Sequence, residues 1–143
     1  MYDDPVRTVM RKRKLLTAKP EASVLQVARR MAKRNVGAVL VVDESGLTGI
    51  LTERDVVFRV VGAGLDPRAT RVAEVMTRNP VTIAPERPFG QALAIMHRQG
   101  FRHLPVVQDG KVLGIVSARS ALDPELEEFA SEARRREHYL AMR

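Results

Sequence analysis

Residues 36–57 have the sequence VGAVLVVDESGLTGILTERDVV, and residues 101–122 have the sequence FRHLPVVQDGKVLGIVSARSAL. The second stretch follows the plan of the first 65 positions later: an apolar run, a polar turn, a second apolar run containing Gly-Ile, and then a hydroxyl residue. Extending this comparison aligns residues 17–55 with residues 82–120 without a gap, and 10 of the 39 paired positions are identical. Because a single repeat usually cannot bury its apolar face alone, the sequence predicts two related units that share a core.

Each copy predicts the same order of elements, β-α-β-β-α. A short extended segment (15–18 or 81–84) comes first, and two apolar runs on either side of a polar turn predict a later β-hairpin. Between them, apolar residues recur at the helical spacing i, i+3, i+4, i+7. These stripes are Val24, Val27, Ala28 and Met31 in copy one, and Phe89, Ala92, Leu93 and Met96 in copy two. Ser23 and Gln26 match a capping box. Residues 53–61 predict a second helix that buries Val56, Val57, Val60 and Val61.

The composition is that of an ordinary globular protein. The 143 residues suffice for one sizeable core, with 45% hydrophobic and 29% charged residues. The absence of cysteine excludes disulfides, thiol nucleophiles and cysteine-ligated metal centres. The longest run of apolar residues and glycine, 36–42, is far shorter than the ~18 residues that span a bilayer. Residues 1–10 lack the apolar stretch of a secretory signal, so we expect a cytoplasmic protein without a membrane partner.

The net charge is positive, at +7 from 24 basic and 17 acidic residues. A basic balance admits nucleic acid, an anionic membrane surface or a small phosphorylated ligand as a partner. Four consecutive basic residues, 11–14, form the one dense patch, whereas two Tyr, four Phe and no Trp provide few platforms for stacking bases. Charge alone leaves the partner open, and a nucleic-acid-associated protein stays one alternative.

The two copies resemble the cystathionine-β-synthase (CBS) domain, and the tandem is similar to a CBS pair, or Bateman module. The resemblance rests on the two stretches quoted above and on residues 75–100, VMTRNPVTIAPERPFGQALAIMHRQG. It implies an α/β (α+β) fold in which two repeats, residues 6–64 and 65–122, pack sheet to sheet with pseudo-twofold symmetry. Such pairs are usually regulatory modules rather than enzymes. They bind AMP, ADP, ATP or S-adenosylmethionine between the repeats and often associate as homodimers.

Copy one carries a complete family motif in residues 49–55, GILTERD, which match Gly-h-h-(Thr/Ser)-x-x-Asp with h apolar. Thr52 and Asp55 are therefore expected to bind the ribose of the ligand at the start of a helix. A carboxylate can accept hydrogen bonds from both vicinal hydroxyls, and a helix N-terminus favours phosphate. The same residues also match a helix cap that needs no ligand, and we expect the two roles to be combined.

The resemblance implies further contacts for this ligand. Arg102 and His103, at the start of a strand in copy two, are expected at the phosphates, completing one crevice with Asp55. The adenine end is expected at Ile50, Thr77, Val81, Thr82 and Phe101. A surface arginine and a structural histidine are the alternatives for the two basic residues.

Copy two departs from the motif, because Ser120 stands where the acid belongs. A serine cannot hold two hydroxyls as an anion does, so a second cleft is expected to bind adenosine ligands more weakly. The residues expected there are Thr17, Val36, Gly37, Ser117 and Ser120.

No other motif indicates chemistry. The three histidines lack metal-ligand spacing, and no nucleophile is paired with a base. We therefore expect no metal, no cofactor besides the regulatory ligand, and no enzymatic activity. A structural dimerisation module with vestigial clefts is the remaining alternative. Asp123 and Pro124 predict the start of a C-terminal helix over residues 123–143, in contact with its own module or with a partner.

Overall fold

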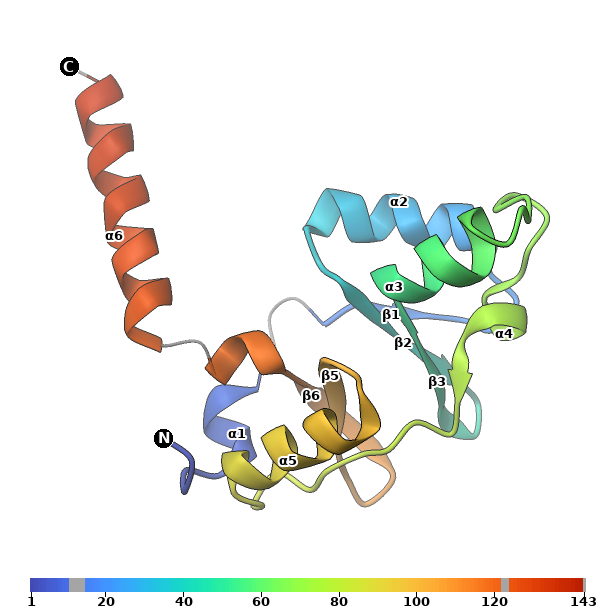
Figure 1. Cartoon of the computed structure of the whole chain (residues 1–143), viewed down its shortest axis with the longest axis horizontal. Helices are drawn as coiled ribbons and strands as arrows, with labels where there is room; N and C mark the ends of the chain where they lie inside the picture. Colours follow the sequence, from blue (N-terminus) through green and yellow to red (C-terminus); the bar gives the residue numbers. More distant parts are fainter. Residues whose placement is uncertain (11–14, 122–123, 143) are drawn as a thin grey trace.

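The structure is a computed structural model that describes residues 1–10, 15–121 and 124–142. Its elements form two units of sheet and helix, followed by a helix that extends away from both (Figure 1). The elements of copy one are α1 (Val6–Val9), β1 (Thr17–Ala18), α2 (Val24–Arg34), β2 (Ala38–Asp43), β3 (Gly46–Thr52), α3 (Glu53–Asp55) and the π-helix η1 (Val56–Val61). Those of copy two are α4 (Val72–Val75), β4 (Thr77–Arg78), α5 (Phe89–Gln99), β5 (His103–Gln108), β6 (Lys111–Ser117) and the 3-10 helix η2 (Ala118–Ala121), before α6 (Pro124–Ala141).

The first unit is a four-stranded sheet in the order β1-β2-β3-β4, covered by α2. β1 runs parallel to β2, and the other neighbours are antiparallel. The predicted stripe of α2 supplies its core, because Val24, Val27 and Met31 are buried. The predicted capping box is present, and in it the backbone amide of Gln26 donates a hydrogen bond to Ser23 Oγ at 3.2 Å.

The second unit repeats this plan around the β5–β6 hairpin. The hairpin pairs His103 with Ser117, as β2 and β3 pair Ala38 with Thr52 65 positions earlier. Its core contains the fully buried Phe89 of α5. The predicted extended segment at residues 81–84 makes one parallel bridge, from Ile83 to Val106, instead of a strand.

The two units exchange their first helices. Val6 of α1 is fully buried in the core of the second unit, and its amide donates to the Arg87 carbonyl. Conversely, Val72 of α4 is buried in the first unit, and β4 pairs with β3. The linear division at 64/65 therefore describes the repeats of the sequence, whereas the packed units are interlocked.

The predicted sheet-to-sheet packing is confirmed. A third apolar cluster joins Leu40 and Ile50 of the first sheet to Val112 and Ile115 of the second. This shared core places the ends of the strands of both copies around a common space.

One expectation about the helices is wrong. The second helix of copy one spans the predicted residues, but it buries only Val60 fully; Val57 and Val61 are 56% and 66% exposed. Residues 56–61 wind as a π-helix, whose i→i+5 hydrogen bonding departs from the α-helical spacing on which the prediction relied.

The C-terminal helix forms as predicted. It projects outward, and residues 132–142 are exposed (Figure 1), so its contact with its own module or with a partner stays a prediction. The proposed cap Asp123 lies outside the described residues.

Candidate functional site between the repeats

A cleft of about 930 Å³ lies between the two copies. It is lined by the end of α2, the start of β2 and the α3–η1 helix of copy one, and by the start of β5 and the β6–η2 junction of copy two. Its volume falls within the range of about 300–1,000 Å³ that is usual for small-molecule sites. The polar and charged residues that line it are Asn35, Glu53, Arg102, His103, Ser117 and Arg119.

The basic wall of the cleft comes from copy two. Arg102 immediately precedes β5, and its carbonyl accepts a hydrogen bond from the Ala118 amide at 2.9 Å. The side chains of Arg102 and Arg119 are exposed, and neither forms an ion pair with any described residue. His103 is half-buried beside them. The structure therefore brings the two basic residues predicted from the sequence into a cleft, together with a third that sequence analysis missed.

The opposite wall comes from copy one. Val36 and Gly37, predicted for the second site, precede β2 and line the cleft. Glu53, the first residue of α3, lines it as well, and its amide donates to the Gly37 carbonyl at 2.9 Å. Ser117 is buried at the cleft, with its Oγ 3.4 Å from Ser120 Oγ. One cleft thus combines residues that sequence analysis assigned to two different sites.

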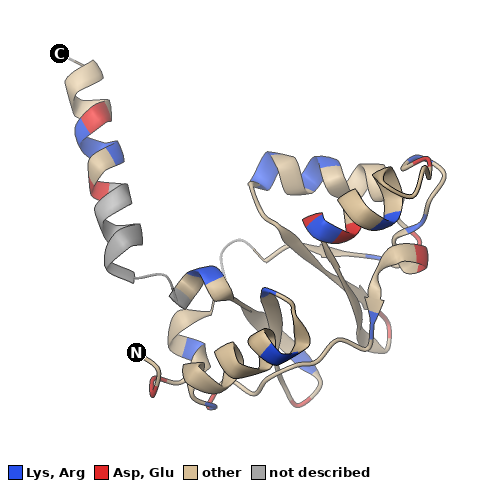
Figure 2. Ribbon diagram, in the orientation of Figure 1, with Lys and Arg blue, Asp and Glu red and all other residues tan. Residues whose placement is uncertain are grey.

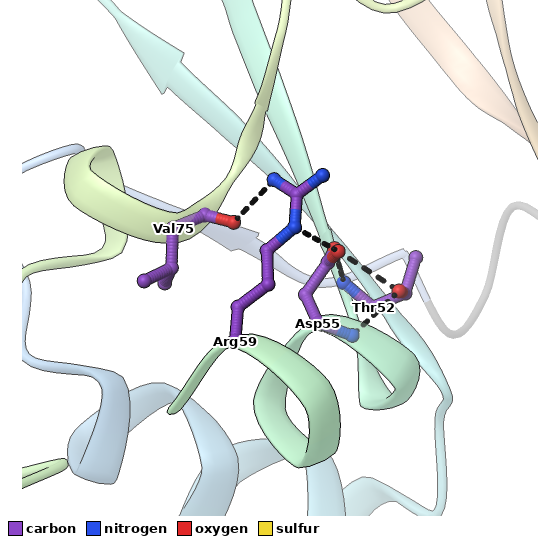
Figure 3. Close-up of polar contacts among 4 residues, drawn as sticks. All are labelled: Thr52, Asp55, Arg59 and Val75. Carbon is purple, nitrogen blue, oxygen red and sulfur yellow. Dashed lines mark hydrogen bonds and ion pairs between the residues drawn. The ribbon is translucent and has the colours of Figure 1, made fainter. Parts of the chain in front are cut away.

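Asp55 does not line this cleft, although the sequence predicted one crevice for Asp55, Arg102 and His103. Its carboxylate is held at the start of its own helix, where Oδ2 accepts from the Thr52 amide at 2.9 Å and from Thr52 Oγ1 at 3.0 Å. Arg59 forms an ion pair with the other oxygen at 3.6 Å (Figure 3). Local capping and this ion pair therefore satisfy the carboxylate, and a joint site of Asp55 with Arg102 and His103 stays a prediction.

The other predicted contacts also lie outside the cleft. Ile50 is buried between the sheets, and Phe101 is half-buried against the core of the second unit. Thr77 is exposed on β4, paired with Ile50 in the register of the sheet. Val81, Thr82 and Thr17 are exposed, and Ser120 is half-buried.

Sequence analysis missed Glu53 and Arg119. Arg119 is identical to its equivalent Arg54 in the repeat alignment. Glu53 occupies a variable position of the motif, next to the Asp55 carboxylate to which the chemistry was assigned. The difference in charge between Glu53 and its equivalent Ala118 could have found Glu53, whereas no such difference marks Arg119.

Basic residues occur on both units and on α6 (Figure 2). The dense patch at 11–14, on which the nucleic-acid alternative depends, lies outside the described residues. Over the part of the chain that the structure describes, no three His, Cys, Asp or Glu side chains form a group that could hold a metal ion. Within the same residues, none of the helices has the length and apolarity that a transmembrane segment requires.

Comparison with known proteins identifies the family. The CBS-domain profile matches residues 6–62 and 72–124. Over 122 residues, 83% of this chain, the sequence is 42% identical to the CBS domain-containing protein CBSCBSPB2 of Arabidopsis thaliana. The chain belongs to the CBS-domain family, as a tandem pair, and CBS pairs are regulatory modules. The chain spans only about a fifth of the length of its plant and yeast relatives, 23% of CBSCBSPB2 and 18% of the meiotically up-regulated gene 70 protein of Schizosaccharomyces pombe.

Solved structures share this fold. A conserved protein from Pyrococcus horikoshii superimposes with a TM-score of 0.78 and 32% identity, over 85% of this chain and 92% of that one. The CBS domain pair of protein MJ0100 superimposes with a TM-score of 0.73 and 28% identity, over 82% of this chain and 95% of that one. That pair was solved in complex with 5′-methylthioadenosine and S-adenosyl-L-methionine.

Proposed function

We propose that this CBS pair is a regulatory module that binds an adenosine-type ligand in the cleft between its repeats. The observation that carries the proposal is a cleft of ligand size in which Arg102 and Arg119, on one wall, form no ion pair with any residue that the structure describes. Unpaired guanidinium groups in a concave site favour a ligand with a phosphate or another anionic group. The complex of the MJ0100 pair with two adenosine compounds supports the choice of ligand class.

Arg102 and His103 are assigned to the anionic end of the ligand, and Val36, Gly37 and Ser117 to the walls of the same cleft. Thr52 and Asp55, predicted at the ribose, and Thr77, predicted at the adenine, are assigned to a separate position around the end of β3. For the Asp55 carboxylate to bind ribose there, it would have to exchange the capping bonds and Arg59 for the ligand. Occupancy regulates only through a difference in ligand affinity between two conformations of the module.

Isothermal titration of ligand-stripped protein with AMP, ATP and S-adenosylmethionine tests this proposal. Because a hydrogen bond to a charged group contributes about 1.5–3 kcal/mol, Arg102→Ala should weaken the binding of AMP roughly ten- to hundredfold. Arg68→Ala, an equal loss of charge in the connection between the copies, is the matched control and should bind as the wild type does. Absence of binding for all three ligands to folded wild-type protein would contradict the proposal.

We also propose that the protein partner is a second copy of this chain, and that the two copies contact each other at the exposed face of η1. Val57, Phe58 and Val61 are each more than half exposed there, and the Arg54 guanidinium lies 4.7 Å from the centre of the Phe58 ring. Exposed apolar clusters of this kind commonly mark protein interfaces. Because Val57 also lines the cleft, a ligand would contact the helix that carries the dimer face.

Light scattering coupled to size-exclusion chromatography tests the dimer. The wild type should have twice the mass of the chain, and Phe58→Glu should be monomeric, because burying a carboxylate against the partner is unfavourable. Tyr139→Glu, which places the same charge on the exposed end of α6, is the control and should remain dimeric. If the Tyr139 variant is monomeric instead, the contact belongs to α6.

A cytoplasmic location stays a prediction from the sequence.

A further inference from the structure

The two walls of the cleft are built on equivalent backbone but carry opposite charges. Position 37 corresponds to position 102 in the repeat alignment, and position 53 corresponds to position 118. In copy one the Glu53 amide donates to the Gly37 carbonyl, and in copy two the Ala118 amide donates to the Arg102 carbonyl, both at 2.9 Å. All four residues line the cleft. The charged side chain has therefore changed places between the copies: an acid follows the β-hairpin in copy one, and a base precedes the hairpin in copy two.

Gly37 makes room for the acid. A Cβ atom at this position would lie 3.0 Å from Glu53 Oε1 and 3.2 Å from Glu53 Cδ. The carboxylate consequently lies against the backbone of residue 37, at the point where the cleft wall begins. Among the described residues, the Glu53 side chain has no hydrogen-bond or ion-pair partner.

The charges in the cleft do not neutralise one another. No ion pair joins Glu53 to Arg102 or to Arg119 in the described part of the chain, although all three line one cleft. A carboxylate only accepts hydrogen bonds, whereas guanidinium groups only donate them. A ligand that satisfies both walls must carry donors at one end and an anionic group at the other.

We propose that Glu53 supplies the carboxylate that copy two lacks at Ser120, and that it binds the ribose hydroxyls of a ligand whose anionic group lies at Arg102 and Arg119. This inference rests on the proposed function, since the ribose is the donor group that adenosine-type ligands share. Ser117 and Ser120 contribute no charge to the cleft, and their hydroxyls lie 3.4 Å apart. The backbone of the cleft is pseudo-symmetric, but its two walls carry opposite charges. The ligand can therefore bind in one orientation, with its ribose at Glu53 and its anionic group at the arginines.

The test compares three ligands: AMP, its 2′,3′-dideoxy analogue, which lacks both hydroxyls, and adenosine, which lacks the phosphate. Glu53→Gln should weaken the binding of AMP about tenfold, because a charge-assisted acceptor is lost. It should change the binding of the dideoxy analogue by less than about twofold, because the partner groups are absent. Arg102→Ala should weaken the binding of AMP and of the dideoxy analogue by the same factor and leave the binding of adenosine nearly unchanged.

Two further variants test whether the position of the Glu53 carboxylate affects binding independently of the stability of the fold. Gly37→Ala should push the flexible Glu53 carboxylate aside and weaken the binding of AMP as much as Glu53→Gln does. The thermal unfolding temperature should stay within a few degrees of that of the wild type. Glu44→Gln removes the same charge from the exposed β2–β3 turn and should bind all three ligands as the wild type does.

The outcomes distinguish the two proposals. If the wild type binds none of the three ligands, this inference fails, and if it binds neither ATP nor S-adenosylmethionine either, the proposed function fails as well. If the wild type binds AMP but Glu53→Gln weakens AMP and the dideoxy analogue equally, Glu53 does not contact the ribose. If Glu53→Gln binds AMP more tightly, the carboxylate repels the phosphate instead of binding hydroxyls. Either of the last two results overturns the inference and leaves the adenosine-binding cleft standing.

Discussion

The two copies have nearly the same backbone and different polar chemistry. Their hairpins pair residues in the same register, and each has an irregularity at the same place, between Val41 and Val42 and between Val106 and Val107. The long helices also end alike, at the equivalent residues Asn35 and Gly100, which both have positive φ. Buried apolar positions therefore preserve the backbone across a pair of sequences that are identical at only 10 of 39 positions.

The polar positions that differ lie where helices begin and around the cleft. Ser23 forms a capping box at the start of α2, whereas its equivalent Pro88 makes no side-chain cap. Thr52 forms another capping box, with Asp55, in copy one, where copy two has the two serines. Such changes cost little packing energy, so one copy can acquire an acidic wall and the other a basic wall without loss of the fold.

The largest effect is expected from the cores. Phe89 and its equivalent Val24 are the first residues of their helices, and both are fully buried. Phe89→Ala should lower the free energy of unfolding by about 3–5 kcal/mol, and Val24→Ala by about 1.5 kcal/mol, because fewer buried methylenes are lost. Equilibrium unfolding in urea measures both. Equal losses would show that the second core does not depend on its aromatic side chain.

The helix caps should also differ in strength. Asp55→Ala removes an acceptor from the Thr52 amide in a site that is 9% exposed, and should cost about 1–3 kcal/mol of stability. Ser120→Ala removes only the long contact to Ser117 and should cost less than about 0.5 kcal/mol. Urea unfolding of the two variants under one condition gives the comparison. A Ser120 variant as destabilised as the Asp55 variant would mean that copy two has a cap of similar strength.

Adding the acid to copy two should produce a smaller gain. Ser120→Asp places a carboxylate at the position equivalent to Asp55, where it can accept a hydrogen bond from the Ser117 amide. We expect a stabilisation of about 0.5–1 kcal/mol, which raises Tm by about 2–4 °C at most for a chain of this size. Differential scanning calorimetry measures the change. A lowered Tm would indicate that the 3-10 turn of copy two does not accept a capping box.

The smallest effect concerns the hairpin turns. In copy one, the Ser45 hydroxyl and then the Ser45 amide donate to Asp43 Oδ1, at 2.6 and 2.7 Å, and hold the pKa of Asp43 below its ordinary value. Stability from these bonds is present above the unfolded pKa of the carboxyl and is lost as the pH falls through the lower folded pKa. Ser45→Ala should move the pKa of Asp43 upward, as followed by the NMR shift of its carboxyl carbon. Copy two has Gln108 at this position and a turn through Asp109 and Gly110, so Gly110→Ala should disturb that turn because residue 110 has a positive φ.

Most of the fold could be predicted from the sequence. Helical spacing identified the buried faces of α2 and α5, and apolar runs around polar turns identified both hairpins. These signals are local, because side-chain burial on one element follows its own period. The exposed side chains of η1 were predicted to be buried because its four valines recur at the α-helical spacing i, i+1, i+4, i+5, and spacing alone could not indicate which of them meet the sheet.

The candidate site was only half predicted. Arg102, His103, Val36, Gly37 and Ser117 lie in one cleft, but the sequence divided them between two sites and assigned the carboxylate to Asp55. A Thr-x-x-Asp motif is compatible with a cap and with a ligand site, and in this structure the local hydrogen bonds of the cap hold the carboxylate. Glu53 was missed because its role depends on the opposite wall, which comes from the other copy.

The sequence by itself determined the repeat, its long helices and hairpins, and the family, because repetition and apolar periodicity are properties of neighbouring residues along the chain. Only the tertiary structure decided which short helix packs on each unit. α1 packs on the second unit through contacts between residues about 80 positions apart, such as Arg7 with Glu86. α4 packs on the first unit through contacts between residues about 20 to 50 positions apart, such as Val72 with Ala22. The tertiary structure also decided which charged side chains share a cleft. That grouping depends on how two sheets face each other, a relation between surfaces for which no local sequence pattern carries a signal.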